Sequence, residues 1–436
     1  MDAVTNDDDA GGPRPEPGRE DGPAPMEQPR DGEPGTQPRG EPGSAPHSEA
    51  ADTPAPRSRR RRWLRWAAVG GAFVVLTATG IGAALYLKFE DNITTDTRTA
   101  EILKRYDKER PIPEVHDAKN ILLIGSDSRE GDNRRYGEDD GQARSDTAIL
   151  LHLSADRKSA TAVSLPRDLM VTVPRCVDRR EGEESPEQFA QFNWAYEFGG
   201  ASCTIRTVEE LTGIRVDHHV VIDFQGFKRL VNAVDGVEVC LPKPVVDRDA
   251  KLRLPAGRQT LRGEDALGYV RARHALGDGS DTERMERQQE FLASLFRKVR
   301  GTGVLMNPAK LVPVLDAATS SLTADEGLNS LTELYDLVRS LRELPEEGLV
   351  FLTVPRQPYS QDPNRDELVQ PEADRLFTLI RKDRPVDVVQ QSEDAERRQE
   401  ADGSRGERDT GDDDDRSEPT PTPTYSGATA EHETCD

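Results

Sequence analysis

A run of 22 residues without a charged side chain, from Trp66 to Leu87, is the feature that most restricts how this chain can fold. A helix of that length spans the roughly 30 Å hydrocarbon core of a bilayer, whereas a buried helix of a soluble protein more often has about ten to fourteen apolar residues. The run is also too long, and too far from the N-terminus, for the apolar part of a cleaved signal peptide. We therefore predict one transmembrane helix over residues 66–88.

The charges on either side of this helix predict its orientation. The basic segment 57–65 precedes it with six arginines, and only Lys88 follows it before acidic residues begin. Because basic residues stay on the cytoplasmic side, we expect a single-pass membrane protein with its N-terminus in the cytoplasm. Residues 89–436 are then outside the cell.

The two ends of the chain differ in composition from the rest. Residues 1–56 hold 13 acidic and 4 basic side chains, residues 391–436 hold 15 and 5, and aromatic residues are scarce in both. Such segments bury too little apolar surface to offset chain entropy, so we predict that both acidic tails are disordered and dispensable for the fold. Of the formal net charge of −23, about −4 remains for the residues between them, which is not the basic balance of a nucleic-acid-binding domain.

Between the tails we predict a polar extracellular stalk or leading helix, residues 89–117, and one folded domain, residues 118–385. Short apolar runs such as 119–126 alternate there with segments of helical period such as 282–301. Alternation of this kind predicts an α/β fold, with a single domain built on a central mixed β-sheet and helices on both of its faces.

The cysteines are interpreted from the predicted compartment. Disulfides persist outside the cell, and Cys176 and Cys203 flank a 26-residue segment, so we predict a bridge between them. Cys240 lies in an apolar run and is expected to be a buried free thiol. Cys435 belongs to the acidic tail and receives no assignment.

Arginine is concentrated in one stretch of this acidic chain. Arg271 and Arg273 end one predicted helix, and Arg284 follows near the start of the next. Arg284 and Gln288 lie three and seven positions after Asp281, so these residues share one helix face. Guanidinium groups bind phosphate oxygens in a two-point fork, which favours a polyanion such as a pyrophosphate. The alternative is a solvated helix face stabilised by Glu–Arg pairs.

A second group of charged residues lies where apolar strands are predicted to begin or end. Asp127 and Arg129 follow the first strand, Arg144 and Asp146 precede the next, and Arg167 follows a third. Ligands of open α/β sheets bind near strand ends. Since Mg²⁺ prefers one or two carboxylates together with phosphate oxygens, the carboxylates beside these arginines suit a divalent ion, Mg²⁺ or Mn²⁺, that bridges them to a bound phosphate.

Several motifs occur in a fixed order: NILLIGSDSR, RSDTAILLHL, SLPRDLMV, FNWAYEFGG, DFQGFKRLVNAVDGVEV and LRGEDALGYVRARHALGDGSDTERMERQQ. Together they resemble the LytR-CpsA-Psr family of cell-envelope proteins, densely over residues 118–300 and onward to residue 385. The resemblance implies a phosphotransferase that moves an anionic glycopolymer from a polyprenyl-pyrophosphate carrier to peptidoglycan. Its partners would be that lipid-linked polymer, peptidoglycan and membrane lipid, with no nucleic acid. The alternative is an extracellular protein that binds the same lipid-linked polymer without transferring it.

The resemblance also implies roles for individual residues. The catalytic residues are expected to be Arg144, Asp146, Arg167 and Asp281. The substrate-binding residues are expected to be Arg271, Arg273 and Gln288 by this resemblance, together with Arg129 and Arg284 from the two groups of charged residues above. Asp146 or Asp281 is the candidate proton acceptor, and Asp127 and Asp146 match the family's Mg²⁺-linked aspartates. Where many members carry a lysine this chain has Gln191, so one cationic contact near the phosphates is expected to be missing.

Overall fold

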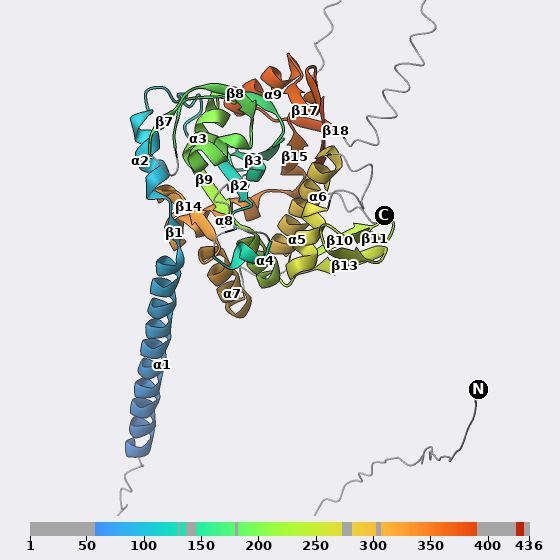
Figure 1. Ribbon diagram of the computed structural model, residues 1–436. Helices are drawn as coiled ribbons and strands as arrows, with labels where there is room; N and C mark the ends of the chain where they lie inside the picture. Colours follow the sequence, from blue (N-terminus) through green and yellow to red (C-terminus); the bar gives the residue numbers. More distant parts are fainter. Residues whose placement is uncertain are drawn as a thin grey trace, which may run out of the picture. The chain divides into compact units, whose positions relative to one another are not determined.

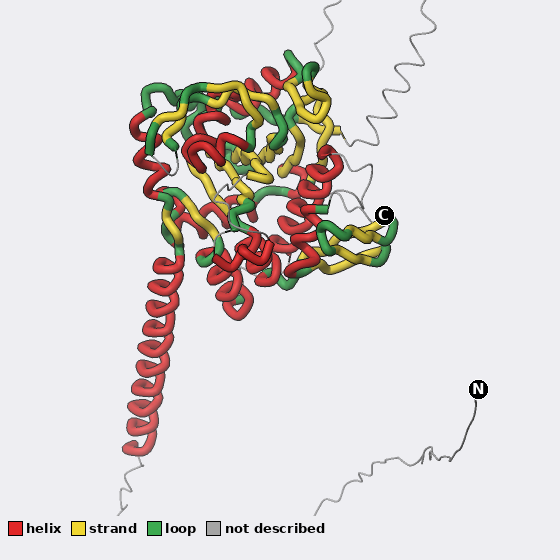
Figure 2. The backbone as a smooth tube through the Cα atoms, in the orientation of Figure 1, coloured by secondary structure: helices red, strands yellow, loops and turns green. Residues whose placement is uncertain are grey.

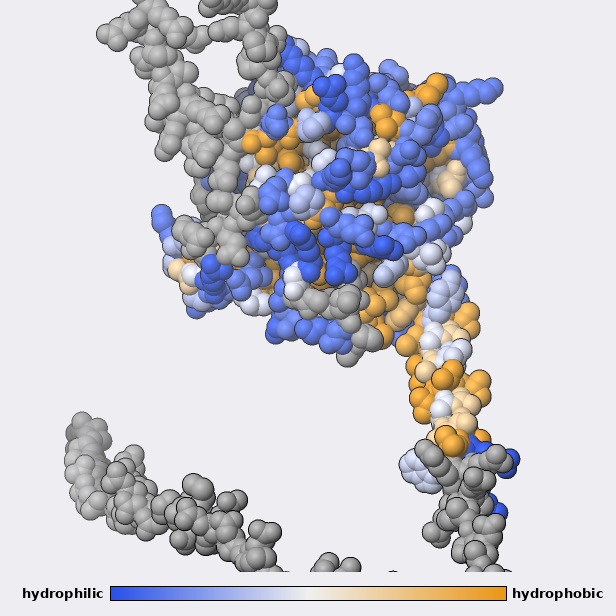
Figure 3. Space-filling view, turned by 180° about the vertical axis from the view of Figure 1, so that it is seen from behind, coloured by the Kyte–Doolittle hydropathy of each residue, from blue (hydrophilic) through white to orange (hydrophobic). Residues whose placement is uncertain are grey.

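The structure, a computed structural model, describes residues 57–129, 131–136, 145–178, 182–272, 281–301, 307–389 and 424–430. The chain divides into two compact units, residues 1–69 and 70–436. The long apolar segment forms helix α1 (Arg57–Asn92), and its residues 62–92 are long and apolar enough to cross a membrane. Phe73 and Leu76 on this helix are each 70 % exposed, and the space-filling view shows the apolar surface along it (Figure 3). Such a surface suits a lipid environment rather than water.

The described part of residues 70–436 contains a mixed sheet of nine strands (Figures 1 and 2). In spatial order the strands are β1 (Thr94–Thr95), β14 (Leu322–Ala324), β9 (His218–Ile222), β2 (Lys119–Ser126), β3 (Ser145–Leu153), β4 (Ala160–Leu165), β15 (Leu349–Thr353), β19 (Thr424–Thr429) and β18 (Asp387–Val389). β2 is parallel to β9 and β4 is parallel to β15, whereas β3 is antiparallel to both β2 and β4. The predicted mixed central sheet is confirmed.

Helices cover both faces of this sheet, as predicted. The covering helices are α3 (Trp194–Thr212) and α9 (Glu372–Arg381) on one face, and α6 (Asp281–Gly301) and α8 (Leu331–Glu343) on the other. Leu122 and Ile124 of β2 belong to the core shared with α3 and α9, whereas Ile121 belongs to the core shared with α6 and α8. Side chains alternate between the two faces of a strand, so an almost continuous apolar run serves two cores at once.

A smaller group of elements forms a third core. It comprises α4 (Phe224–Ala233), α5 (Gly263–Arg271), the antiparallel pairs β10 (Val237–Leu241) with β13 (Gly257–Leu261) and β11 (Val245–Asp247) with β12 (Leu252–Leu254), and part of α6. α7 (Pro308–Thr319) packs against α4. Further short antiparallel pairs are β5 (Met170–Val173) with β8 (Gln188–Gln191), β6 (Cys176–Val177) with β7 (Glu184–Ser185), and β16 (Arg356–Tyr359) with β17 (Asp362–Leu368). Phe291 of α6 is fully buried in the third core, so α6 links this core to the sheet.

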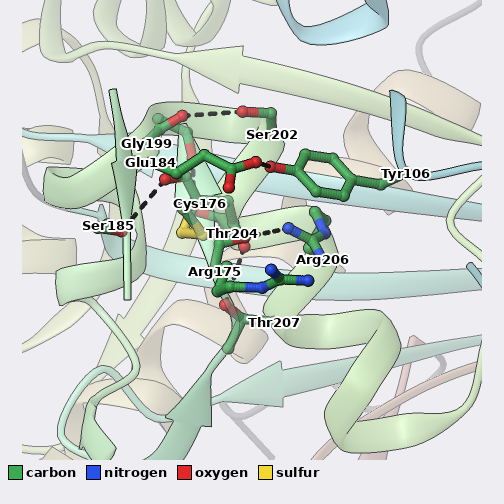
Figure 4. Close-up of a disulfide and its surroundings, with 12 residues drawn as sticks. Tyr106, Arg175, Cys176, Glu184, Ser185, Gly199, Ser202, Thr204, Arg206 and Thr207 are labelled. Atoms are coloured by element: carbon green, nitrogen blue, oxygen red, sulfur yellow. Dashed lines mark hydrogen bonds between the residues drawn. A yellow bond between two sulfur atoms is a disulfide. The ribbon is translucent and has the colours of Figure 1, made fainter. Parts of the chain in front are cut away.

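The segment predicted to be a polar stalk, residues 89–117, is part of the folded unit. β1 pairs with β14, and α2 (Thr97–Arg105) packs against α3. The Tyr106 hydroxyl donates to Glu184, and the Arg206 guanidinium lies 3.5 Å from the Tyr106 ring centroid (Figure 4). Arg110 pairs with Glu209 at 2.7 Å. The leading-helix alternative fits α2, and the segment is not a free stalk, because Ile102, Leu103 and Tyr106 are buried against the domain.

The cysteine predictions had different outcomes. Cys176 and Cys203 form the predicted disulfide, which ties β6 to α3 (Figure 4). Cys240 is disulfide-bonded and only half-buried, so the prediction of a buried free thiol was wrong. Val239 and Leu241 point into the third core, and strand alternation turns Cys240 to the opposite face of β10. Cys435 lies outside the described residues.

The prediction that the whole C-terminal tail lacks structure is corrected by β19. This strand lies between β15 and β18, antiparallel to the first and parallel to the second. Tyr425 is 6 % exposed and Ala430 is fully buried, and the Ala430 amide donates to the Leu349 carbonyl at 3.0 Å. The sequence did not predict β19 because the tail has few apolar residues. A strand that pairs with an existing sheet needs few of them.

Candidate functional site

Several of the charged residues singled out in the sequence lie where neighbouring strands of the central sheet begin or end. β2 ends at Ser126, directly opposite Ser145, the first residue of β3. β4 ends at the same end of the sheet because it is antiparallel to β3. Asp127, Asp146 and Arg167 therefore lie at the same end of three neighbouring strands. We call this end of the sheet, with these three residues, the strand-end edge.

A β-bulge determines where Asp146 lies. Gly125 pairs with Thr147 and Ser126 pairs with Ser145, which leaves Asp146 as the extra residue of β3. A Cβ atom on Gly125 would lie 3.2 Å from the Thr147 Cβ, so a glycine permits the close approach of the two strands at the bulge. Bulges re-aim single side chains and are frequent beside functional sites. The sequence contains no signal for this bulge.

Arg167 connects these strands through ion pairs. Its Nη1 lies 3.4 Å from Oδ1 of Asp146, and its Nε donates to Oδ2 of Asp168 at 3.2 Å. The Arg167 side chain is 18 % exposed, so the pairs are screened less by water than surface pairs are. An anion that reaches this edge would thus meet a guanidinium whose orientation is already fixed.

Asp168 is a site residue that the sequence analysis did not assign. Its Oδ1 accepts a hydrogen bond from Gln191 Nε2 at 3.0 Å and lies 3.6 Å from Nη1 of Arg365. In the sequence, only the adjacent Arg167 indicated that Asp168 belongs to the site. Arg365 gave no signal, because it lies almost two hundred residues further along the chain and only the fold brings it here.

Helix α6 contributes side chains to the strand-end edge and also anchors itself there. The Thr147 hydroxyl donates to Oε1 of Gln288 at 3.5 Å, and Gln288 Nε2 donates to the Val270 carbonyl at 3.1 Å. Gln289 Nε2 donates to the hydroxyls of Ser164 and Thr353, each at 3.0 Å. The predicted polar contact Gln288 therefore lies beside the bulge, next to the residue that follows Asp146.

The arginines of α6 are more buried than a solvated helix face would make them. Arg284 is 5 % exposed and Arg287 is 8 % exposed. The Arg287 guanidinium donates to the carbonyl of Ala272, at the end of α5, and burial lowers its pKa. This burial argues against the alternative in which exposed Glu–Arg pairs explain the arginines. Arg287 helps to hold α5 against α6.

Arg271 lies at the other end of the strand-end edge. Its guanidinium is 4.4 Å from the Phe224 ring centroid and 6.0 Å from that of Tyr136, while the side chain stays exposed. Phe224 begins α4 just after β9, so the aromatic ring orients the arginine at the end of that strand. Arg129 is half-buried three residues beyond β2. Arg144, Arg273 and the side chain of Asp281 lie outside the described residues, although Asp281 begins α6.

The carboxylates were tested for their fit to a divalent cation. Among the described residues, no group of three or more His, Cys, Asp or Glu side chains is gathered to hold a metal ion. Asp127 follows β2 and Asp146 belongs to the adjacent β3, and their carboxylate oxygens are of the kind that suits Mg²⁺ when phosphate oxygens complete the coordination. The residues therefore fit a cation that arrives with a phosphate rather than a closed metal centre.

A cavity lies at the opposite ends of the strands, near the start of β9 and beside α2. It has a volume of about 230 Å³ and is lined by side chains of both charges, among them Arg215, His218, His219 and Asp325. His218 Nδ1 lies 3.1 Å from Asp325, and His219 Nε2 lies 3.3 Å from Asp96. These contacts join α2, β9 and the segment after β14. Arg129, Arg167 and Arg271 do not line this cavity.

The fold and the strand-end edge define a class of protein: an α/β domain with one candidate membrane span and a row of arginines and carboxylates suited to a phosphate. Residues 89–382 match the model of the LytR_cpsA_psr family. The chain belongs to the LytR-CpsA-Psr family.

Individual relatives agree with this assignment. The chain is 37 % identical over 263 residues to "Cell wall biosynthesis protein LcpA" of Corynebacterium glutamicum, covering 55 % of this chain and 50 % of that protein. It is 29 % identical over 304 residues to the "Polyisoprenyl-teichoic acid--peptidoglycan teichoic acid transferase TagT" of Bacillus subtilis, covering 66 % and 86 %. The crystal structure of protein gbs0355 from Streptococcus agalactiae matches with a TM-score of 0.50 and 22 % identity over 62 % of this chain and 91 % of that chain, a similarity of fold. The chain spans about half the length of the two Corynebacterium relatives LcpA and LcpB.

Proposed function

We propose that this protein transfers an anionic glycopolymer from a polyprenyl-pyrophosphate carrier to peptidoglycan at the outer surface of the membrane. Family membership and the name of the relative TagT support the reaction class. The observation that carries the proposal is the strand-end edge, where Arg167 is held between Asp146 and Asp168. A guanidinium oriented by two carboxylates suits the paired oxygens of a phosphate.

In this proposal the arginines bind the pyrophosphate of the donor. The binding residues are Arg144, Arg167, Arg271 and Arg273, with Arg129, Arg284 and Gln288 as further contacts. The ring of Phe224 fixes Arg271 from one side, and the ion pairs fix Arg167. Phosphoryl transfer depends mainly on positioning and charge stabilisation, and fixed arginines supply both.

The transfer itself exchanges one P–O bond for another. The acceptor hydroxyl oxygen attacks the phosphorus that carries the glycopolymer, and the bond from that phosphorus to the bridging oxygen breaks. Polyprenyl phosphate leaves with the electron pair, and the hydroxyl proton passes to the carboxylate of Asp146 or Asp281 and then to water. Asp127 and Asp146 would hold Mg²⁺ or Mn²⁺, which neutralises charge on the leaving phosphate when it is bound.

The test is single-turnover transfer from a lipid-pyrophosphate donor to a muropeptide acceptor, with Mg²⁺, by the full-length protein. Arg271→Lys should reduce the transfer rate by about tenfold, because lysine keeps the charge but not the planar fork or the stacking on Phe224. Arg339→Lys is the matched control, since Arg339 is exposed and pairs with Glu343 within α8. Wild-type protein that binds the donor but releases no polymer would instead support the non-catalytic alternative.

A further inference from the structure

The β16–β17 hairpin is fixed to the loop that carries Arg167. The Asp366 amide donates to the Asp168 carbonyl at 3.1 Å, and Asp366 forms an isolated β-bridge with Leu169. Arg356 of β16 pairs with Asp366, and both side chains are largely buried. β16 also follows directly on β15, whose last residues lie beside β4. The hairpin is therefore a fixed part of the strand-end edge.

Arg365 is the basic residue that this hairpin brings to the edge. Its Nη1 lies 3.6 Å from Asp168 Oδ1 and its Nε lies 3.8 Å from Asp362 Oδ2. Both separations exceed hydrogen-bond length, so the two carboxylates orient the guanidinium electrostatically. Nη1 donates to the Asn364 carbonyl at 3.4 Å, which leaves most of the five N–H donors of the guanidinium for a ligand. The side chain is 33 % exposed, which leaves it accessible to a ligand from solvent.

The order of the strands places Arg365 far from Arg271. Arg271 lies at the end of β9, and the edge then runs through β2, β3 and β4 to β15, which leads into the hairpin. Neighbouring strands are about 4.8 Å apart, so the edge from β9 to β15 is about 19 Å long. A single pyrophosphate covers only a fraction of that length. The end of the edge beyond Arg167 is available for another anionic group.

We propose that Arg365 binds an anionic group of the glycopolymer itself, next to the pyrophosphate, and so selects donors whose first repeating units carry a phosphodiester or a carboxylate. This inference rests on the proposed function. An anionic polymer carries such groups in its repeating units, and an arginine with available N–H donors is a suitable partner for the first of them. Asp168 is a positioning residue, because it orients both Arg167 and Arg365.

The test compares two donors that share a farnesyl-pyrophosphate disaccharide, one of which also carries a glycerol phosphate unit. Equilibrium binding of both donors to the full-length protein is measured by calorimetry. In Arg365→Ala the ratio of affinities, charged over uncharged donor, should fall by about tenfold, the usual effect of losing one charge-assisted contact. Arg365→Lys should lie between, and Arg339→Ala should match wild type.

The outcomes separate this inference from the proposed function. An unchanged affinity ratio in Arg365→Ala would refute the inference, whether or not the protein transfers polymer. A change confined to the KM of a muropeptide acceptor would place Arg365 on the acceptor side and also refute it. Failure of the wild-type protein to transfer polymer, with the ratio still falling in Arg365→Ala, would reject the proposed reaction and keep the binding role. The fold of each variant is checked by thermal melting. If Arg365→Ala does not fold, the affinity ratios are measured for Arg365→Lys and Arg365→Gln instead.

Discussion

At the scale of single residues, the strand-end edge balances fixed positive charges with carboxylates. Arg167 is bracketed by Asp146 and Asp168, and Arg365 by Asp168 and Asp362. Such pairs orient a guanidinium well, but their carboxylates also repel an incoming phosphate. A divalent cation beside Asp146 would relieve that repulsion, which is a physical reason for the proposed Mg²⁺ to arrive with its phosphate.

A different carboxylate, Asp96, predicts an acid sensitivity at the N-terminal side of the domain. Burial raises the pKa of Asp96, but hydrogen bonds with His219 and the Thr99 amide outweigh it and lower the pKa to about 2. The side chain is 21 % exposed and caps α2 through the Thr99 amide. A carboxyl with a lowered folded-state pKa stabilises the protein above its unfolded pKa near 3.8, and this stabilisation is lost as the pH falls towards 2.

We therefore expect Asp96 to contribute about 2 kcal/mol at neutral pH and to lose that contribution between about pH 4 and pH 2. Asp96→Asn keeps a side-chain oxygen for the cap but removes the charge beside His219, so its stability should change less over that range. The measurement is denaturant unfolding at successive pH values for both proteins. Parallel pH profiles would show that the Asp96 carboxylate does not provide this stability.

At the scale of elements, the sequence predicted segments that have a clear apolar pattern and missed those that have none. The strand over 119–126 and the helix over 282–301 are confirmed, because each has a clear apolar pattern. The hairpin with Arg365 and the strand β19 were not predicted, since neither has an apolar pattern of its own. The bulge at Asp146 depends on the register between two strands, which no local pattern specifies.

The position of β19 leads to a prediction about the C-terminal end. A chain that stops after residue 423 loses the pairing with β15 and β18, the buried Tyr425, and the bond from Arg297 to the Ala430 carbonyl. We expect its free energy of unfolding to fall by about 3 kcal/mol, because buried apolar surface and sheet hydrogen bonds are lost together. Differential scanning calorimetry of the truncated and full-length proteins measures the change.

Two control variants separate the strand from the residues that follow it. A chain that stops after residue 430 keeps β19, and Cys435→Ser keeps the whole chain but removes its last cysteine. If the strand is responsible, the chain that stops after residue 423 should be less stable than either control. Equal stability of all three would mean that β19 adds nothing to the sheet.

At the scale of the whole molecule, two independent features predict the same orientation in the membrane. Six arginines lie in residues 57–65, on the N-terminal side of the apolar run, whereas the disulfide Cys176–Cys203 lies on the C-terminal side. Basic residues stay in the cytoplasm, and disulfides persist in oxidising compartments outside it. Cys240 is also disulfide-bonded and belongs to the same side of the apolar run.

We therefore expect a periplasmic-type reporter such as alkaline phosphatase to be active when fused after residue 100 and inactive when fused before residue 50. Alkaline phosphatase needs its own disulfides, so its activity reports export directly. The mirror-image fusions to a cytoplasmic reporter, which folds only inside the cell, are the control and should give the reverse pattern. Replacing the six arginines with glutamate should weaken the bias, because the charge difference across the span determines the orientation. Alkaline phosphatase activity only in the fusion before residue 50 would place the strand-end edge inside the cell, away from peptidoglycan, and would exclude the proposed reaction there.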